Sequence, residues 1–488
     1  MDIYTLKNNR MLCWDDFFID KKENVNIIMH KPTKTSDRAI CDNDWDGNCN
    51  GYARFIKVGE KYYLYYRAAG SVTTRDGTKW KPAVLCLKAS HDGKHWRNVM
   101  INKHEYGHET FNSIVIDRKF DNFSVFYDEN PSCPENEKYK ALSMGGGTHP
   151  NYAEDNGPEG LYLFVSGNGI DFEPRGRLDI PGTFDSYNVM MWDKDNEEYR
   201  FFYRTERRAD DEEFDVEHKS TSVFRTVSTS VSKDLVHFEH YGELIYPEDA
   251  AKLQLYTNQI VKYYRASDMF IGFPTRYIER WDGLENYEHM PLAKRKKHAI
   301  EVGGREGAAV TDTAIMTSRD GLHFNLRNEA YMTPGIETRN NWWYGNNYTV
   351  YGIEETESDI DGAPNELSFY MGDAYHVKNT NFDRYAVRID GFFSWYADYK
   401  GGQVLTRPFT FEGGSLTVNF ATSAVSDMTV TVCDIDGNEL EGYKSYKMFG
   451  DSLERQVDFE KPLENLEGRP VRLKFHLKDC HLYSFCFK

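Results

Sequence analysis

Residues 50–68 read NGYARFIKVGEKYYLYYRA, and this stretch predicts two β-strands joined by a tight turn. The side chains of residues 52–57 alternate between two faces, as they do along a strand. Val58–Lys61 supplies the turn, and residues 62–66 are mostly aromatic and favour extended structure. The stretch is therefore expected to form a β-hairpin.

The same hairpin pattern returns four more times along the chain, and every copy begins at an asparagine. The starting residues are Asn50, Asn112, Asn188, Asn258 and Asn346. Each copy pairs a strand that follows the asparagine with a second strand. Repetition of one supersecondary unit at this spacing indicates an architecture built from repeats.

A second signature, a Ser-x-Asp or Ser-x-Asn turn followed by an aromatic residue, recurs in these units. It begins at Ser90, Ser166, Ser232 and Ser318, and a degenerate fifth copy occupies residues 388–395. Asp-Gly and Asn-Gly supply the positive φ that a tight hairpin turn requires, so we interpret these turns as structural. Two strands of the hairpin and two strands around the turn make a four-stranded unit. The chain is therefore expected to be all-β, with a five-bladed β-propeller.

Composition excludes several classes of function. The chain has 488 residues and a formal net charge of -18, which disfavours nucleic acid and anionic membranes as partners. Its eight cysteines form no pair with the spacing of a zinc site. Residues 1–12 lack the apolar run of a secretory signal, and no segment is long and apolar enough to span a bilayer, so we expect a cytoplasmic protein.

The repeat pattern also predicts the domain organisation. Residues 1–40 are expected to form an N-terminal segment whose short strands close the ring or pack on its side. Residues 41–395 are expected to form the catalytic propeller. Residues 396–488 alternate apolar and polar positions with a turn at Asp436, which predicts a small antiparallel β-sandwich.

Three carboxylates are candidates for catalysis because they precede the hairpins at similar positions. Glu109 and Asp185 stand three residues before the repeated asparagine, and Asp46 stands one step further back in the first unit. The inner strands of a propeller begin at one mouth of its channel, so these side chains are expected to converge. Glycoside hydrolysis needs such carboxylates, one ionised and one protonated. For any single residue, a capping or rim role is the competing interpretation.

The second strand of each hairpin returns to the same mouth, so residues at its end are candidates for binding substrate. Asp128 and the three arginines Arg67, Arg204 and Arg276 stand there. Arginine donates to sugar hydroxyls or to a substrate carboxylate, or pairs with the catalytic carboxylates. Trp45 and Trp343 lie beside predicted strand starts, where their faces could stack on sugar rings or simply be buried.

The expected partner is thus a carbohydrate substrate. No metal site is predicted, because the scattered histidines show no metal-ligand spacing. No cofactor is expected; a structural calcium ion is left open without support from any motif. The sequence also leaves open whether the chain forms a homo-oligomer.

Several motifs resemble those of known enzymes. Trp45–Asn48, the strands at residues 51–55 and 61–67, and the Ser-x-Asp-Gly turns resemble the five-bladed propeller glycosidases of glycoside hydrolase families 32 and 43. The resemblance is closer to an uncharacterised bacterial group with a family-32-like propeller and a C-terminal sandwich. It is carried by Tyr139–Leu142, Leu255–Asn258, Arg388–Phe392 and Leu482–Phe485.

This resemblance implies hydrolysis of furanosides or pentosides with a first-blade aspartate, Asp46, as nucleophile or base. The residues themselves favour Glu109 as the general acid, because Tyr106 and Phe111 flank it and could partly desolvate it, which raises a carboxyl pKa. Asp185 would stay ionised to orient the acid or stabilise the transition state. The chain departs from the family pattern, because Asp44-Trp-Asp-Gly-Asn replaces the Asn-Asp-Pro-Asn-Gly box. The Arg-Asp-Pro and Glu-Cys motifs are not intact either, so the identity of the acid stays open.

Two other functions compete with this hypothesis. The three arginines favour a sialidase-like or acidic-sugar hydrolase, although the turns are one residue shorter than the sialidase box. A non-catalytic carbohydrate-binding propeller is the third hypothesis, and it would not need a cluster of carboxylates.

Overall fold

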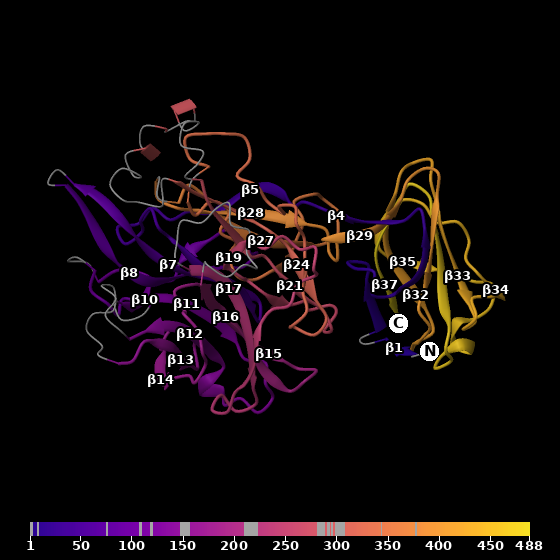
Figure 1. Cartoon of the computed structure of the whole chain (residues 1–488), viewed down its shortest axis with the longest axis horizontal. Helices are drawn as coiled ribbons and strands as arrows, with labels where there is room; N and C mark the ends of the chain where they lie inside the picture. The colour runs from indigo at the N-terminus through magenta and orange to yellow at the C-terminus, as the bar shows by residue number, and fades with distance from the viewer. Residues whose placement is uncertain are drawn as a thin grey trace.

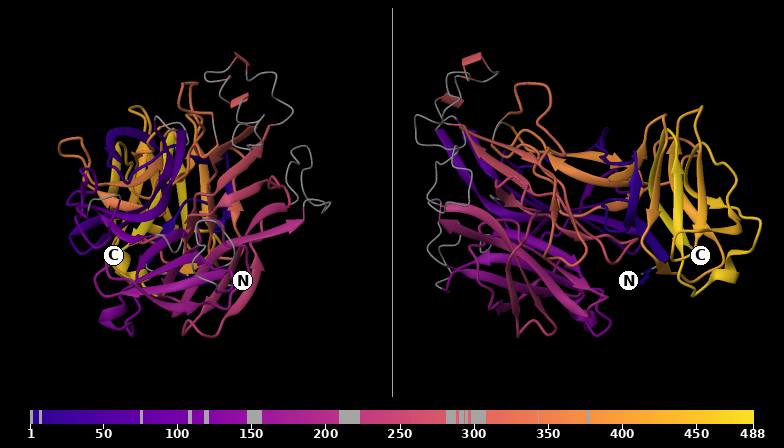
Figure 2. Two further views of the ribbon diagram at one scale, coloured as in Figure 1. Left: turned by 90° about the vertical axis from the view of Figure 1, so that its left-hand side faces the viewer. Right: turned by 45° about the vertical axis from the view of Figure 1, so that its right-hand side comes forward.

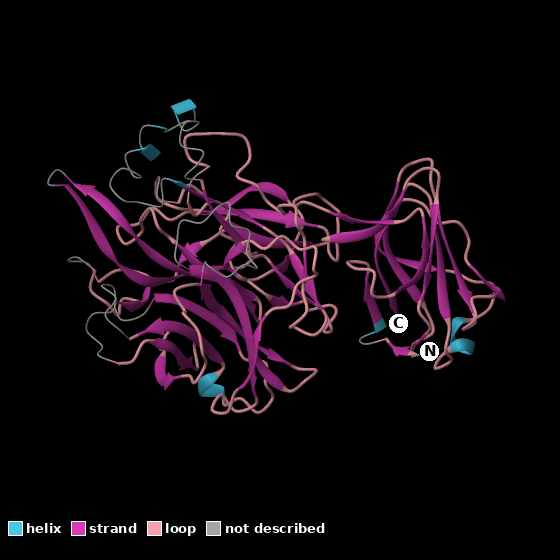
Figure 3. Cartoon of the chain, viewed as in Figure 1, coloured by secondary structure: helices cyan, strands magenta, loops and turns pink. Residues whose placement is uncertain are grey.

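The computed structural model describes residues 3–6, 9–74, 77–106, 110–117, 121–146, 157–208, 223–280, 288–289, 293, 296–297, 308–342, 344–375 and 378–488. Strands dominate this part of the chain (Figure 3). Short 3-10 turns occur at η2 (Glu135–Glu137) and η5 (Leu463–Leu466). No helix among the described residues is long and apolar enough to cross a membrane.

A succession of antiparallel sheets, each formed by consecutive strands, makes up the larger part of the molecule (Figure 1). The first sheet holds β6 (Gly51–Val58), β7 (Lys61–Thr74), β8 (Gly77–Ser90) and β10 (Ile114–Asp117), with β9 (Arg97–Asn98) beside β8. The second holds β11 (Asp121–Tyr127), β12 (Tyr139–Gly145), β13 (Gly160–Ser166) and β14 (Glu173–Arg177). The third holds β15 (Val189–Asp193), β16 (Glu198–Arg208), β17 (Val223–Ser232) and β18 (Glu239–Glu243).

The next unit is interrupted in its middle. One part holds β19 (Gln254–Thr257), β22 (Thr275–Glu279) and β23 (Ala309–Thr313), and the other holds β20 (Val261–Lys262), β21 (Phe270–Gly272), β24 (Met316–Ser318) and β25 (Asn325–Leu326). The two parts meet where the Ala314 N–H donates to the Pro274 carbonyl at 2.9 Å. The expected count of five blades treats both parts as one blade, and that count stays a prediction.

The ring closes in two places. The last sheet holds β26 (Glu354–Thr356), β27 (Glu366–Gly372) and β28 (Phe382–Val387), and its outer strand is the N-terminal β5 (Thr33–Ala39). On the inside, the Phe55 N–H donates to the Tyr351 carbonyl and the Tyr351 N–H donates to the Ala53 carbonyl, both at 2.8 Å. The first inner strand is therefore bonded directly to the last. This arrangement is a β-propeller, as the sequence predicts.

The second repeat does not begin where the sequence suggests. Residues 112–117 were expected to open the second blade, but β10 pairs with β8 and belongs to the first sheet. The innermost strand of the second sheet is β11, which pairs with β12. The asparagine at the start of that inner strand is consequently Asn122, not Asn112, and this shift changes which side chains can reach the mouth.

The Ser-x-Asp turns have the structural role that their sequence predicts. In the first of them, Asp92 accepts hydrogen bonds from the backbone N–H groups of Lys94 and His95 and pairs with the His95 ring at 2.7 Å. Asp234 and Asp320 make the same set of bonds in later units. The carboxylate thus replaces missing backbone partners in a tight turn.

Beyond β28, two sheets enclose a separate apolar core (Figure 2). One holds β4 (Asn26–Met29), β29 (Phe393–Ala397), β37 (Cys480–Phe487), β32 (Leu416–Thr422) and β35 (Asp451–Val457), with β2 (Arg10–Leu12) beside β37. The other holds β3 (Ile19–Glu23), β30 (Gly402–Thr406), β36 (Arg472–Leu477), β33 (Met428–Cys433) and β34 (Glu439–Lys444). A short parallel pair joins β1 (Tyr4–Thr5) to β31 (Phe409–Thr410).

The N-terminal residues therefore serve both parts of the molecule. Of residues 1–40, β5 completes the last propeller sheet, whereas β2, β3 and β4 pair with C-terminal strands. The expected boundary at residue 395 also falls inside β29. The domain limits stay a prediction, but strand pairing indicates that the C-terminal unit includes much of the N-terminal segment.

Asp390 connects the two parts. Its fully buried carboxylate accepts hydrogen bonds from Arg10 at 3.1 Å, Tyr263 at 2.7 Å and Ser484 at 2.6 Å. Arg265 lies 3.5 Å away, and burial together with Asp390 raises the pKa of Tyr263 well above its ordinary value. Asp390 was expected to shape an outer turn; instead it bonds to residues of β2, β37 and the propeller.

Replacing Asp390 is expected to destabilise the whole chain. Asp390→Asn keeps the shape of the side chain but removes the buried charge that pairs with Arg10 and Arg265, and leaves Glu454 as their remaining carboxylate partner. The loss should lower the free energy of unfolding by about 3 kcal/mol. Urea unfolding followed by tryptophan fluorescence measures this. The matched control is Asp234→Asn in an exposed turn of the same type, and an equal effect of the two variants would contradict the assigned role.

Candidate active site

Tyrosine rings gather at the mouth of the channel where the inner strands begin. The repeated asparagines mark them in the sequence, because Tyr52, Tyr187, Tyr256 and Tyr348 each lie within two residues of one. Tyr52 stacks on Tyr187 with ring centroids 5.9 Å apart, and Tyr256 stacks on Tyr348 at 5.8 Å. Tyr52 and Tyr348 join the two pairs at 6.4 Å. Packed tyrosine rings thus form the base of this mouth.

The asparagines themselves fasten the start of each inner strand to the neighbouring backbone. The Asn50 carboxamide accepts hydrogen bonds from the N–H groups of Gly47 and Ala69. Asn188 accepts from the Arg204 N–H at 3.1 Å, and Asn258 donates to the Tyr187 carbonyl at 3.2 Å. All three asparagines are buried. Their repetition therefore has a structural cause, and it fixes where the tyrosines stand.

Three guanidinium groups lie among these rings. Arg67, on β7, stacks over Tyr52 at 4.5 Å and donates to the Tyr375 hydroxyl at 3.0 Å. Arg204, on β16, lies 5.0 Å from the centre of the Tyr256 ring. Arg225, on β17, lies over the same ring at 5.4 Å and donates to Gln254 at 2.7 Å. Arg225 was not predicted, because it lies on the third strand, whereas only the ends of second strands were considered.

Asp185 is the carboxylate that contacts this cluster of tyrosines and arginines. It lies 3.5 Å from Arg204, and its side chain is 59% exposed. Burial raises the pKa of the Tyr52 hydroxyl well above its ordinary value; Tyr256, Tyr344 and Asp185 add to the rise, and Arg67 opposes it. These groups therefore feel one another's charge. Sequence reasoning placed Asp185, Arg67 and Arg204 together, and the structure brings them together.

The guanidinium of Arg204 makes few polar contacts with the described residues. Its side chain is 3% exposed, yet its Nε has no hydrogen-bond partner among the described residues. The contact with Asp185 at 3.5 Å is an ion pair at the edge of hydrogen-bonding distance. Burial opposes its charge, but Tyr256 and Asp185 more than compensate and raise the pKa of Arg204. A buried guanidinium with donors to spare is suited to binding a ligand.

A second carboxylate of the mouth, Glu279, was missed. It ends β22, is buried, and accepts a hydrogen bond from the Tyr277 hydroxyl. Tyr277 stacks on Tyr256 at 5.6 Å, which connects Glu279 to the aromatic cluster. The sequence pattern placed the end of the second strand of this unit at Arg276, whereas β22 continues for three more residues and ends at Glu279.

Asp46 is placed differently from the expectation. It is 2% exposed and accepts hydrogen bonds from Tyr66 at 3.0 Å and from the Asn43 side chain at 2.7 Å. Burial raises the pKa of this carboxyl, with the bonds from Asn43 opposing the rise. The preceding residue, Trp45, is buried in an apolar cluster that also contains Tyr66, so its ring is not exposed to a sugar. In this conformation Asp46 braces the loop before β6, and its role as nucleophile or base stays a prediction.

Two of the expected binding residues lie elsewhere. Arg276 forms a bidentate pair with Asp312, with N–O distances of 2.7 and 2.6 Å. Asp128 is fully buried, paired with Lys140 and bonded to the Tyr199 hydroxyl at 2.8 Å. Because β11 is the inner strand of its sheet, its end at Asp128 lies at the opposite mouth. The misplaced start of the second blade caused this error.

Two predicted site residues, Glu109 and Trp343, lie outside the described residues. Asn112 does not open a blade, so the alignment of strand starts that predicts Glu109 at the mouth does not hold in this unit. Among the described residues, no group of three or more His, Cys, Asp or Glu side chains is placed to hold a metal ion.

Comparison with known proteins gives only distant likenesses. No protein-family model matches this chain, and no curated protein matches its sequence significantly. Among solved structures, a glycoside hydrolase shares 12% identity with a TM-score of 0.45, covering 72% of this chain and 92% of that chain. An N-acetylgalactosamine deacetylase from F. plautii shares 10% identity with a TM-score of 0.43, covering 73% and 94%.

A third solved structure is the catalytic domain of the Coprinopsis cinerea GH62 alpha-L-arabinofuranosidase. It shares 9% identity with a TM-score of 0.40, covering 74% of this chain and 99% of that chain. At these levels of similarity, no activity is transferred to the present protein.

The spare hydrogen-bonding capacity of Arg204 leads to a prediction about stability. Arg204→Met removes a buried charge with few partners, so the free energy of unfolding should stay within about 1 kcal/mol of wild type or rise. Thermal and urea unfolding measure this.

The matched control is Arg384→Met. Arg384 is also fully buried, but it donates to Ser368 and Asp37, both at 2.8 Å, and pairs with Glu366. That variant should lose about 3 kcal/mol or more. If Arg204→Met is as costly as Arg384→Met, Arg204 is a structural residue.

Proposed function

We propose that the chain is a glycoside hydrolase whose active site is the tyrosine- and arginine-lined mouth of the propeller. The observation that carries this proposal is the pairing of exposed Asp185 with buried Arg204 above stacked tyrosine rings. Aromatic faces bind the apolar faces of sugar rings, and guanidinium groups donate to their hydroxyls. A carboxylate beside such a platform is in a position to act on the glycosidic bond.

Hydrolysis requires two carboxyl groups with different protonation states. We assign Asp185 the ionised role, as nucleophile or as base for a water molecule, because it is exposed and lies 3.5 Å from the Arg204 guanidinium. The general acid is either Glu279, which is buried beside Tyr277, or Glu109. Asp46 then acts indirectly, by holding the loop that leads into β6.

The substrate is proposed to be a furanoside or pentoside-type oligosaccharide, as the resemblance to families 32 and 43 implies. Arg67, Arg204 and Arg225 also favour a second candidate, a hydrolase for sugars that carry a carboxylate, because a guanidinium fork matches that group in a bidentate manner. A panel of chromogenic glycosides that includes pentofuranosides, uronides and sialosides distinguishes the two substrates. Saturable binding without any turnover would indicate a non-catalytic binding propeller.

Four substitutions identify the catalytic carboxylates, measured on the glycoside that is cleaved best. Asp185→Asn is expected to lower kcat by a factor of about 100 or more without changing the unfolding temperature. Either Glu279→Gln or Glu109→Gln should have an effect of the same size, and the one that does is the acid. Asp46→Asn should lower stability as well as turnover, because Asp46 is a buried hydrogen-bond acceptor.

Asp312→Asn is the control, because Asp312 is committed to Arg276 outside the cluster. If Asp185→Asn turns over at the wild-type rate, the active site does not lie at this mouth. If none of the four carboxylate variants loses turnover, hydrolysis by paired carboxylates is excluded here.

A further inference from the structure

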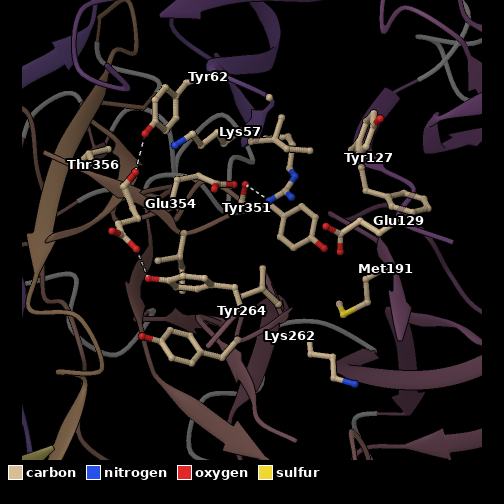
Figure 4. A pocket seen from close by; sticks show the side chains of 18 of the residues that line it. Lys57, Tyr62, Tyr127, Glu129, Met191, Lys262, Tyr264, Tyr351, Glu354 and Thr356 are labelled. Atoms are coloured by element: carbon tan, nitrogen blue, oxygen red, sulfur yellow. Dashed lines mark hydrogen bonds between the residues drawn. The ribbon is translucent and has the colours of Figure 1, made fainter. Parts of the chain in front are cut away.

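A large cavity lies at the opposite mouth of the channel. Its volume is about 970 Å³, and it is lined by residues from the far ends of β6, β11, β15, β20 and β26. Figure 4 shows side chains from these elements arranged around it, among them Lys57, Tyr127, Met191, Lys262 and Glu354. A cavity of this size is at the upper end of the range for small-molecule sites.

Tyrosine rings separate this far cavity from the proposed active site. Tyr351, which lines the cavity, packs edge-on against Tyr187 with ring centroids 5.8 Å apart. Tyr187 in turn stacks on Tyr52 of the active-site mouth. Tyr187 and Tyr351 are each no more than 2% exposed. A ligand in the far cavity would therefore not touch the proposed catalytic residues.

Donors and acceptors both face the cavity. Arg54 stacks over Tyr351 at 4.2 Å and donates to its carbonyl at 3.1 Å, and the Arg54 Nε is buried without a hydrogen-bond partner among the described residues. Glu354 and Glu129 point into the space from opposite sides (Figure 4). Burial raises the pKa of Glu354 to about 7, with Arg54 and Lys57 opposing the rise.

One wall is held rigid by its own hydrogen bonds. The Tyr264 hydroxyl donates to the Glu355 carboxylate at 2.7 Å, and Asn365 donates to the same carboxylate at 2.7 Å. Tyr62 donates to the Glu355 carbonyl at 2.6 Å. Although it is fixed in this way, Tyr264 is 52% exposed. A preorganised and exposed aromatic ring next to carboxylates is typical of sites that bind sugars.

We propose that the far cavity is a second, non-catalytic site that binds a short neutral oligosaccharide. Charges of both signs line it: six carboxylates, among them Glu129, Glu354 and Glu355, accept hydrogen bonds, and Arg54, Lys57 and Lys262 donate them. A strongly charged ligand would meet repulsion from one set, whereas sugar hydroxyls both donate and accept. Tyr264 supplies a face on which a sugar ring stacks. This second site goes beyond the proposed hydrolysis and does not depend on it.

The test measures binding in solution with the full chain. Neutral oligosaccharides of arabinose, xylose, galactose and glucose are titrated by calorimetry into wild type and into Asp185→Asn, which prevents loss of ligand if the chain hydrolyses it. Tyr264→Ala and Glu129→Gln are each expected to weaken binding by about tenfold or more, equivalent to roughly 1.4 kcal/mol. Both side chains are at least partly exposed, so these variants should fold.

Two further variants locate the bound sugar. Tyr446→Ala removes an exposed tyrosine of the loop between β34 and β35 and should leave the affinity unchanged. Arg204→Met alters the opposite mouth and should leave binding in the far cavity intact. The proposal is overturned if no oligosaccharide of the panel binds with saturation, or if the affinity is unchanged in Tyr264→Ala and Glu129→Gln. Loss of that binding in Arg204→Met would then place the sugar at the opposite mouth.

Discussion

The buried carboxylate of Asp390 is the interaction on which the joint between the two parts of the molecule depends. It receives hydrogen bonds from β2, from the propeller and from β37, and its own carbonyl accepts a bond from the Trp14 indole at 2.8 Å. A buried charge needs partners on all sides. The first residues of the chain, the fourth propeller unit and the last strand must therefore be in place together.

Ring closure imposes the second constraint. The inner strands converge on the centre of the ring, where tyrosine rings pack against one another. Hydrogen bonds between Tyr351 and the backbone of β6 complete the ring, and the same tyrosine packs against Tyr187. The packed rings of Tyr52, Tyr187 and Tyr351 thus also separate two mouths of the channel, and these mouths differ in chemistry. One mouth collects arginines around Asp185, and the other forms a cavity lined by donors and acceptors of both charges.

Much of the candidate site could be read from the repeats. The asparagine at each strand start is buried and bonds to neighbouring backbone, so its recurrence correctly marks where inner strands begin in most units. Asp185, Arg67 and Arg204 follow from that alignment. Where the alignment failed, in the second unit, Asp128 was assigned to the wrong end of the channel. Residues 112–117 have the pattern of an inner strand because β10 is also a buried strand, and pattern alone does not distinguish the two positions.

The sequence by itself determined the all-β class, the propeller and its structural turns, since alternation, turn residues and repetition are local properties of the chain. Only the tertiary structure decided which partners the charged residues have. Arg276 pairs with Asp312, Asp46 bonds to Tyr66, and Asp390 connects two separate sheets, because each contact joins residues that the fold, and not the sequence, brings together. Burial and the choice of partner depend on all the surrounding strands at once, and no local pattern specifies them.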